Sequence, residues 1–76
     1  MLKHIIEYVV KSLVDSPQGV VVTITHEDEK DIFEIKVDTQ DIGKVIGKEG
    51  QTIRALRMLV NALNSTTNEV EITIAK

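Results

Sequence analysis

Two glycines separated by two polar residues form the segment of this chain that is best suited to contact a phosphate. The segment reads Gly47-Lys48-Glu49-Gly50 and lies between two short apolar helical patterns. Glycine has no Cβ, so it permits positive φ and lets another backbone come close. The second glycine also opens the next helix, whose free N–H groups and positive dipole end favour an anion. Lys48 adds a point charge where a phosphate would lie.

A short glycine spacing arises by chance in many sequences, so its neighbours decide how much it means. The neighbours on both sides are aliphatic or cationic: Lys44, Val45, Ile46, Ile53, Arg54 and Arg57. The two arginines are three residues apart, so they share a helix face. The alternative is a plain helix–turn–helix connection in which Gly47 only ends the first helix. Solvated surface charge is the corresponding alternative for the arginines, and core packing for the aliphatic residues.

Side chains for catalysis or metal binding do not come together in the sequence. No serine has an evident base and orienting group. His4 and His26 lie far apart, without cysteine or ligand-spaced carboxylates. The acidic segment 27–29 lacks the glycine and terminal glutamate of an EF-hand loop. We therefore expect no enzymatic activity, no metal site and no cofactor.

The chain is acidic overall, but the segment around its glycine loop is basic. The 76 residues carry a formal net charge of -3, which argues against a general polyanion binder. Residues 41–60 hold four cations and two anions, a balance of +2, which leaves -5 for the rest of the chain. This segregation favours an anionic ligand near the loop, with ordinary surface charge as the alternative.

Composition also bounds the compartment and the number of domains. Cysteine is absent, so neither a disulfide nor a thiolate metal site can form, which fits a reducing compartment. No apolar run approaches membrane-spanning length, and the first seven residues mix charged with apolar side chains, unlike a signal peptide. We expect a soluble cytoplasmic protein with one domain over residues 1–76.

Apolar periodicity predicts the order of the elements. Helices are predicted over residues 1–14, over a short stretch ending at Val45, and over residues 53–63. Strands are predicted over residues 20–25, 33–37 and 70–74. A polar hairpin loop over residues 26–30 joins the first two strands, and Asp38 or Thr39 caps the short helix.

This order, α-β-β-α-α-β, defines an α+β architecture. The hairpin makes the first two strands antiparallel, and a crossover through two helices suits a parallel third strand. Each strand has one apolar and one mainly polar face, so helices cover only one side of the sheet. The sequence therefore predicts a three-stranded mixed sheet with three helices packed on one face.

The element order and the glycine loop together resemble the type II KH fold, whose GXXG loop clamps the backbone of about four nucleotides. The turn LVDSP at 13–17, the valine-rich strand after it and the run VIGKEG at 45–50 look like the small bacterial stand-alone KH proteins of the KhpA family. The resemblance covers essentially the whole chain. It implies binding of single-stranded RNA in the cytoplasm, and pairing with a second copy or with a larger KhpB-type (Jag or EloR) KH protein. It also implies post-transcriptional regulation or RNA chaperoning, linked to cell-wall biogenesis and cell shape.

The resemblance further implies which residues contact RNA. By position, the phosphate-facing loop comprises Gly47, Lys48, Glu49 and Gly50. The aliphatic residues lining a base groove beside it are Val45, Ile46 and Ile53, and the flanking cations are Lys44, Arg54 and Arg57. Glu49 puts an anion inside the loop, so we expect modest affinity per domain and a benefit from dimeric or tandem binding.

The last predicted helix has a wide apolar arc. With Ala55, Met58 and Ala62 included, the arc spans about 220°, against about 100° for a helix with one buried side. Either the sheet and the first helix both cover it, or it forms a homodimer surface beside the loop. A protein-interaction or dimerisation module with little RNA affinity therefore stays as the alternative to an RNA-binding module.

Overall fold

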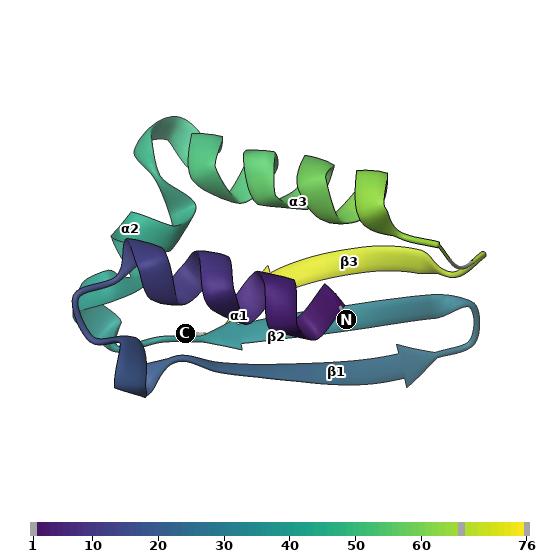
Figure 1. Cartoon of the computed structure of the whole chain (residues 1–76), viewed down its shortest axis with the longest axis horizontal. Coiled ribbons are helices and arrows are strands. Elements are labelled where there is room, and N and C mark those ends of the chain that lie inside the picture. Colours follow the sequence, from purple (N-terminus) through teal and green to yellow (C-terminus); the bar gives the residue numbers. More distant parts are fainter. Residues whose placement is uncertain (1, 66, 76) are drawn as a thin grey trace.

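A three-stranded sheet forms one layer of the molecule and helices form the other (Figure 1). The computed structural model describes residues 2–65 and 67–75. The strands lie side by side in the order β1 (Val21–Glu27), β2 (Lys30–Lys36), β3 (Glu69–Ile74). β1 pairs antiparallel with β2, and β2 pairs parallel with β3. The predicted mixed sheet is therefore confirmed.

The helices α1 (Leu2–Leu13), α2 (Ile42–Ile46) and α3 (Gln51–Leu63) lie over one face of this sheet (Figure 1). Short 3-10 turns connect the elements at Pro17–Gly19, Thr39–Asp41 and Lys48–Gly50. The element order confirms the predicted α-β-β-α-α-β fold. Within the described residues, no helix has the length and apolar character needed to cross a bilayer.

The hydrophobic core lies between the two layers. Its members on the long helices and the strands recur at helical spacing and at alternate positions: Ile6, Val10, Val22, Phe33, Ile35, Ile53, Leu56, Val60 and Ile72. Val14, Val20, Val37 and Val45 complete the core. Each such side chain contributes about 1.5–3 kcal/mol when fully buried. On the opposite face of the sheet, strand register aligns the polar residues Thr23, Glu34 and Thr73. Because only one face of the sheet is apolar, the helices pack on that face.

The connection between β1 and β2 is tighter than predicted. The expected loop over residues 26–30 is wrong, because only Asp28 and Glu29 lie outside the strands. Asp28 adopts a positive φ of 49°, which aspartate tolerates in tight turns. His26 then lies opposite Asp31, with 2.7 Å between His26 Nδ1 and Asp31 Oδ1. Polar residues that resemble a loop in sequence therefore extend the hairpin.

The segment before the glycine loop is a 3-10 turn followed by a short α-helix. Asp38 precedes the turn Thr39–Asp41, but its side chain makes no capping hydrogen bond. The N-cap position of α2 is held by Asp41 and has no side-chain capping hydrogen bond either, so the predicted cap by Asp38 or Thr39 is wrong. At the end of the turn Asp41 is fully buried, so tertiary contacts replace a local cap at this point.

Candidate nucleic-acid interface

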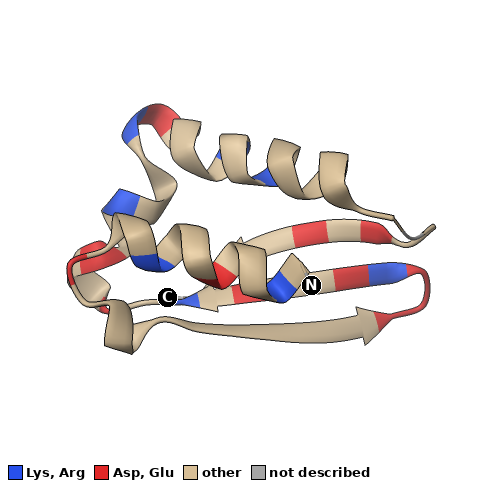
Figure 2. Ribbon diagram, viewed as in Figure 1, with Lys and Arg blue, Asp and Glu red and all other residues tan. Residues whose placement is uncertain are grey.

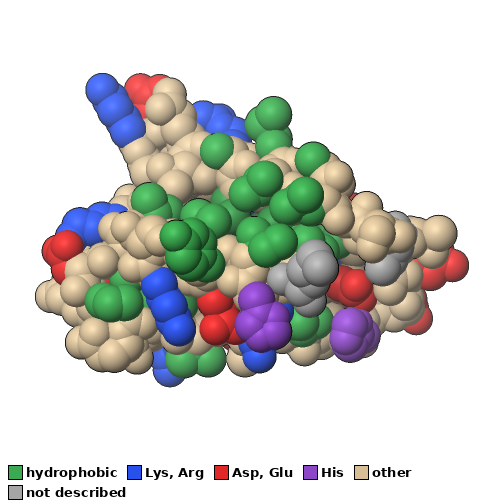
Figure 3. Space-filling model, viewed as in Figure 1, with side chains coloured by type: hydrophobic (Ala, Val, Ile, Leu, Met, Phe, Trp, Pro, Cys, Tyr) green, Lys and Arg blue, Asp and Glu red, His purple; other side chains and the backbone are tan. Residues whose placement is uncertain are grey.

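The glycine loop, residues 47–50, joins α2 to α3 and projects from the body of the molecule (Figure 3). Gly47 has φ 78° and ψ 172°, a region that is essentially closed to residues with a side chain. A Cβ at this position would lie 2.2 Å from Thr52 Oγ1 and 2.8 Å from the Thr52 backbone nitrogen. Both its own backbone and its neighbour therefore require glycine at position 47.

The second half of the loop turns into α3 through left-handed backbone. Glu49 has φ 56° and ψ 26°, and Gly50 has φ 74° and ψ 15°. The Gly50 N–H donates to the Gly47 carbonyl at 3.1 Å, which closes the turn. A Cβ on Gly50 would meet nothing within 4 Å. Gly50 therefore leaves backbone surface open to an approaching molecule.

The charges at the start of α3 suit an anion. No side chain caps the N terminus of this 13-residue helix. The Gln51 N–H donates to the Lys48 carbonyl, so an external acceptor would have to use the N–H groups that follow it in the first turn. Lys48 is exposed, and no carboxylate in the described part of the chain lies within ion-pair distance of its ammonium. Many of the acidic residues lie instead on the strands and the hairpin turn, and others lie in the segment before α2 (Figure 2). Glu49 is the exposed anion within the loop itself.

The two arginines of α3 have different partners. Arg54 Nη2 donates to the Glu49 carbonyl at 2.8 Å, which keeps the guanidinium beside the loop. Arg57 Nη2 donates to the Ile72 carbonyl at 3.1 Å, and Ile72 belongs to the edge strand β3. The two residues share a helix side, as expected, but only Arg54 contacts the loop. Arg57 is directed at the sheet.

The aliphatic residues expected to line a base groove are mostly buried. Val45 has no exposed surface and Ile53 is 7% exposed. Both belong to the core, so the expectation that they line the groove needs correction: they support α2 and α3 from beneath. Val45 and the next residue, Ile46, differ in burial because consecutive side chains of a helix point in different directions. Ile46 is half-buried and packs on the edge of the core, and it presents the aliphatic surface next to the loop.

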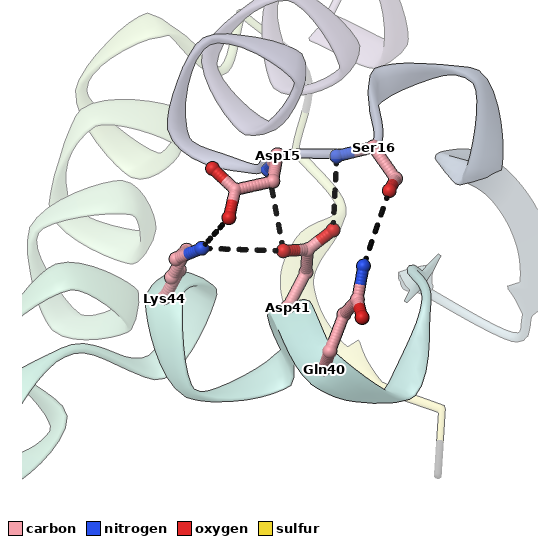
Figure 4. A network of polar contacts seen from close by, with 5 residues as sticks. All are labelled: Asp15, Ser16, Gln40, Asp41 and Lys44. Carbon is pink, nitrogen blue, oxygen red and sulfur yellow. Dashed lines mark hydrogen bonds and ion pairs between the residues drawn. The ribbon is translucent and has the colours of Figure 1, made fainter.

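Lys44 is engaged by carboxylates from two segments. Its ammonium forms an ion pair with Asp15, from the turn after α1, and lies 3.6 Å from Asp41 Oδ1 (Figure 4). The hydrogen bond to Asp15 raises the pKa of Lys44 above its ordinary value. The side chain therefore remains protonated through the neutral range. It points toward the end of α1.

Gly43 is a feature of this surface that was not expected from the sequence. It is exposed in the first turn of α2, its φ is not positive, and a Cβ there would meet nothing within 4 Å. Glycine within a helix costs about 0.5–1 kcal/mol relative to alanine. Nothing in the chain's own packing requires it, so it offers an open backbone surface near the loop. A glycine inside a helical pattern was the available sequence signal.

Two hollows in the described part of the surface lie away from the glycine loop. One of about 400 Å³ is bordered by the hairpin turn and Glu69, and one of about 250 Å³ lies between Ile24, Phe33 and the start of α1. Neither hollow is lined by a residue of the glycine loop. No group of three or more potential metal ligands occurs within residues 2–65 and 67–75. The glycine loop therefore lies on a projecting part of the surface, away from these two hollows.

The fold and the loop together define the class of this protein. A three-stranded mixed sheet, three helices on one face and a two-glycine turn between α2 and α3 make it a type II KH domain. KH domains are binding modules and not enzymes, which agrees with the absence of catalysis expected from the sequence.

Comparison with known proteins identifies the family. A family model described as KhpA/KhpB, KH domain, matches residues 3–74. The RNA-binding protein KhpA of Thermotoga maritima is 36% identical over 99% of this chain and 100% of its own length. Those of Oceanobacillus iheyensis (40% identical; 90% of this chain and 91% of the relative) and Clostridium perfringens (44%; 80% and 81%) are also similar. No solved structure matches. The chain belongs to the KhpA/KhpB KH-domain family.

Proposed function

We propose that this chain binds single-stranded RNA through the glycine loop and the surface of α2 and α3 beside it. The observation that carries the proposal is the loop itself: two glycines with positive φ lie next to an uncapped helix N terminus. The relatives named as RNA-binding proteins support the choice of RNA as the polymer. No reaction is involved, because the site supplies hydrogen-bond donors and charge only.

Different residues of this site would contact the phosphates and the bases of the RNA. A phosphate would accept from N–H groups of the first turn of α3 after Gln51, whose own N–H donates to the Lys48 carbonyl, with Lys48 and Arg54 supplying positive charge. Gly47 and Gly50 let the sugar–phosphate backbone approach the loop. Bases would lie over the open surface at Gly43 and Ile46. Because this surface has no aromatic residue, we expect little base stacking and therefore modest affinity.

The test of this function is a titration with single-stranded RNA and single-stranded DNA of mixed sequence at several salt concentrations. Two phosphate-facing cations should give a slope of log K against log salt near about -1.4, at about -0.7 per phosphate. A preference for RNA over DNA would indicate contacts to the 2′-hydroxyl. If RNA showed no saturable binding at low salt, the chain would be a protein-interaction module instead.

The cellular role that we propose follows from the family. We place the chain in the cytoplasm as a post-transcriptional regulator or RNA chaperone, acting with a KhpB-type partner. The family model, which covers KH domains of both KhpA and KhpB, supports that pairing. We expect the effects of such regulation in cell-wall biogenesis and cell shape.

A second proposed property is weak homodimerisation through α3. Ile53, Leu56 and Val60 face the core, so the sheet and α1 cover only part of the apolar arc. Met58, Leu59 and Leu63 remain 73%, 42% and 48% exposed. Apolar side chains gather on this face of the molecule (Figure 3). A second copy that covers this surface would add stability to a small domain.

Met58→Asp is expected to convert the dimer to monomer without unfolding the chain, since the replaced side chain is exposed and outside the core. Sedimentation equilibrium of the wild type at rising concentration should show mass increasing toward a dimer, and the variant should not. Asn61→Asp is the matched control, because it adds the same charge on the polar stripe of α3 beside Arg54 and Arg57. A wild type that stays monomeric at high micromolar concentration would contradict the proposal.

A further inference from the structure

Asp41 is the charged residue buried most deeply in the described part of the chain. It has no exposed surface, although it is the last residue of the 3-10 turn Thr39–Asp41 and directly precedes a five-residue helix. Burying a carboxylate costs several kcal/mol unless hydrogen bonds and opposite charge compensate. The contacts of the Asp41 carboxylate must therefore compensate for its burial.

The Asp41 carboxylate bonds to a distant turn of the chain. Oδ1 accepts from the Asp15 N–H at 3.2 Å, and Oδ2 accepts from the Ser16 N–H at 3.1 Å (Figure 4). Lys44 completes the cluster by pairing with both Asp15 and Asp41. We call these contacts among Asp15, Ser16, Asp41 and Lys44 the latch. It joins the C-terminal end of α1 to the start of α2.

The helix that the latch holds, α2, is too short to be stable in isolation. α2 has five residues and no side-chain cap at its N terminus, whereas isolated helices need about 12–15 residues to be even marginally stable. Its direction is therefore set by tertiary contacts: the buried side chain of Val45 at one point and the latch at another.

The glycine loop begins where α2 ends. The Gly47 N–H donates to the Gly43 carbonyl at 2.9 Å, so the first loop residue is tied to the last turn of α2. A tilt of α2 would move Gly47 and alter how the loop meets the N terminus of α3. Anything that fixes the start of α2 therefore also fixes the geometry that a phosphate encounters.

We propose that Asp41 is a positioning residue for the RNA-binding loop. In this proposal Lys44 stabilises the latch through its ion pairs and does not contact a phosphate. The proposal rests on the proposed function of the loop and assigns Lys44 a different role from the one its charge suggests. The Lys44 ammonium lies between two carboxylates that already neutralise it. Lys48 and Arg54 remain as the cations beside the loop.

Lys44→Met tests whether Lys44 acts through its ion pairs in the latch, with Lys11→Met as the matched control. Lys11 is also an ion-paired lysine, 3.9 Å from Glu7, and its side chain is 47% exposed against 44% for Lys44. Both variants lose one positive charge. We expect Lys44→Met to bind RNA at least fivefold more weakly than Lys11→Met, with an unchanged salt slope. A slope reduced by about 0.7 would mean that a phosphate contact was lost and would overturn the proposal, as would equal affinities of the two variants.

Exchanging the charges provides a rescue. Lys44→Asp alone should weaken RNA binding, because it also sets a carboxylate beside Asp41. Asp15→Lys combined with Lys44→Asp restores the ion pair between positions 15 and 44 at unchanged net charge, and should bind RNA at least threefold more tightly than Lys44→Asp. A folded double variant that stays as weak as Lys44→Asp would overturn the proposal, because a purely local phosphate contact by Lys44 would not be rescued at position 15. If the double variant fails to fold, the Lys44→Met and Lys11→Met comparison decides.

The wild-type titration separates this proposal from the proposed function. A wild type that binds no RNA would overturn both at once. A wild type that binds RNA, with variants that violate the expectations above, would overturn only the latch. Asp41→Asn adds a direct measurement: it places an amide N–H where the carboxylate faces two backbone donors, so RNA affinity should fall at least tenfold in the folded fraction. Unchanged affinity in folded Asp41→Asn would also overturn the proposal.

Discussion

Replacing Lys48 and Glu49 together by aspartate is expected to weaken RNA binding at least tenfold, or about 1.4 kcal/mol, while the domain stays folded. Both side chains are exposed, so no core contact is lost. Glu49 has a left-handed backbone that aspartate adopts more readily than most residues. The expected loss therefore comes from placing negative charge where a phosphate would lie, and a fluorescence-anisotropy titration would measure it.

A control variant separates this local effect from the change in net charge. Lys3→Asp alters the net charge by the same amount as the loop variant, at an exposed position in the first turn of α1. An acidic residue is tolerated there because it faces the positive end of the helix dipole. We expect Lys3→Asp to bind RNA nearly as well as the wild type. Equal losses in the two variants would show that net charge, and not the loop, governs binding.

Alanine at the two loop glycines is expected to affect stability very differently. Gly47→Ala should lower the free energy of unfolding by at least about 2 kcal/mol, because its φ and ψ are open to glycine alone and its Cβ would collide with Thr52. Gly50→Ala should cost about 1–2 kcal/mol, the penalty of left-handed backbone only. Urea unfolding monitored by circular dichroism would give both values.

A second substitution tests the cause of the Gly47 effect. Thr52→Ala in the Gly47→Ala background should restore little stability, because the Thr52 backbone nitrogen itself would lie 2.8 Å from the new Cβ. Nearly full recovery would mean that only the threonine side chain obstructs the alanine, and that the backbone conformation of the loop is less restrictive than its dihedral angles indicate.

The modest affinity expected of one domain connects the two proposed properties. Glu49 opposes an anion inside the loop, and the chain has a net charge of -3. A dimer through α3 would present two loops to one RNA strand, and the second contact would then form at a high effective concentration. Met58→Asp should therefore lower the affinity for long RNA more than for short RNA, if both proposals hold.

Local pattern in the sequence determined the elements, their order, the mixed sheet and the position of the glycine loop. Periodicities of about 3.6 and 2 residues report which side of each element is buried, and glycine reports where the backbone must turn. The family resemblance followed from the same residues. The elements and the turn depend on neighbours in the chain, and the parallel pairing of β2 with β3 follows from the two-helix crossover between them, so one sequence was enough to predict these features.

The tertiary structure alone decided which polar groups meet. Asp41 looks like a surface carboxylate in the sequence, yet it is buried against the Asp15 and Ser16 backbone, 26 and 25 residues away. Arg57 resembles a partner of the loop but donates to Ile72 on the sheet. Each of these contacts joins segments whose distance and orientation are set by packing of the whole core. A pattern along the chain reports the burial of apolar faces, but it does not identify the partner of a single charge.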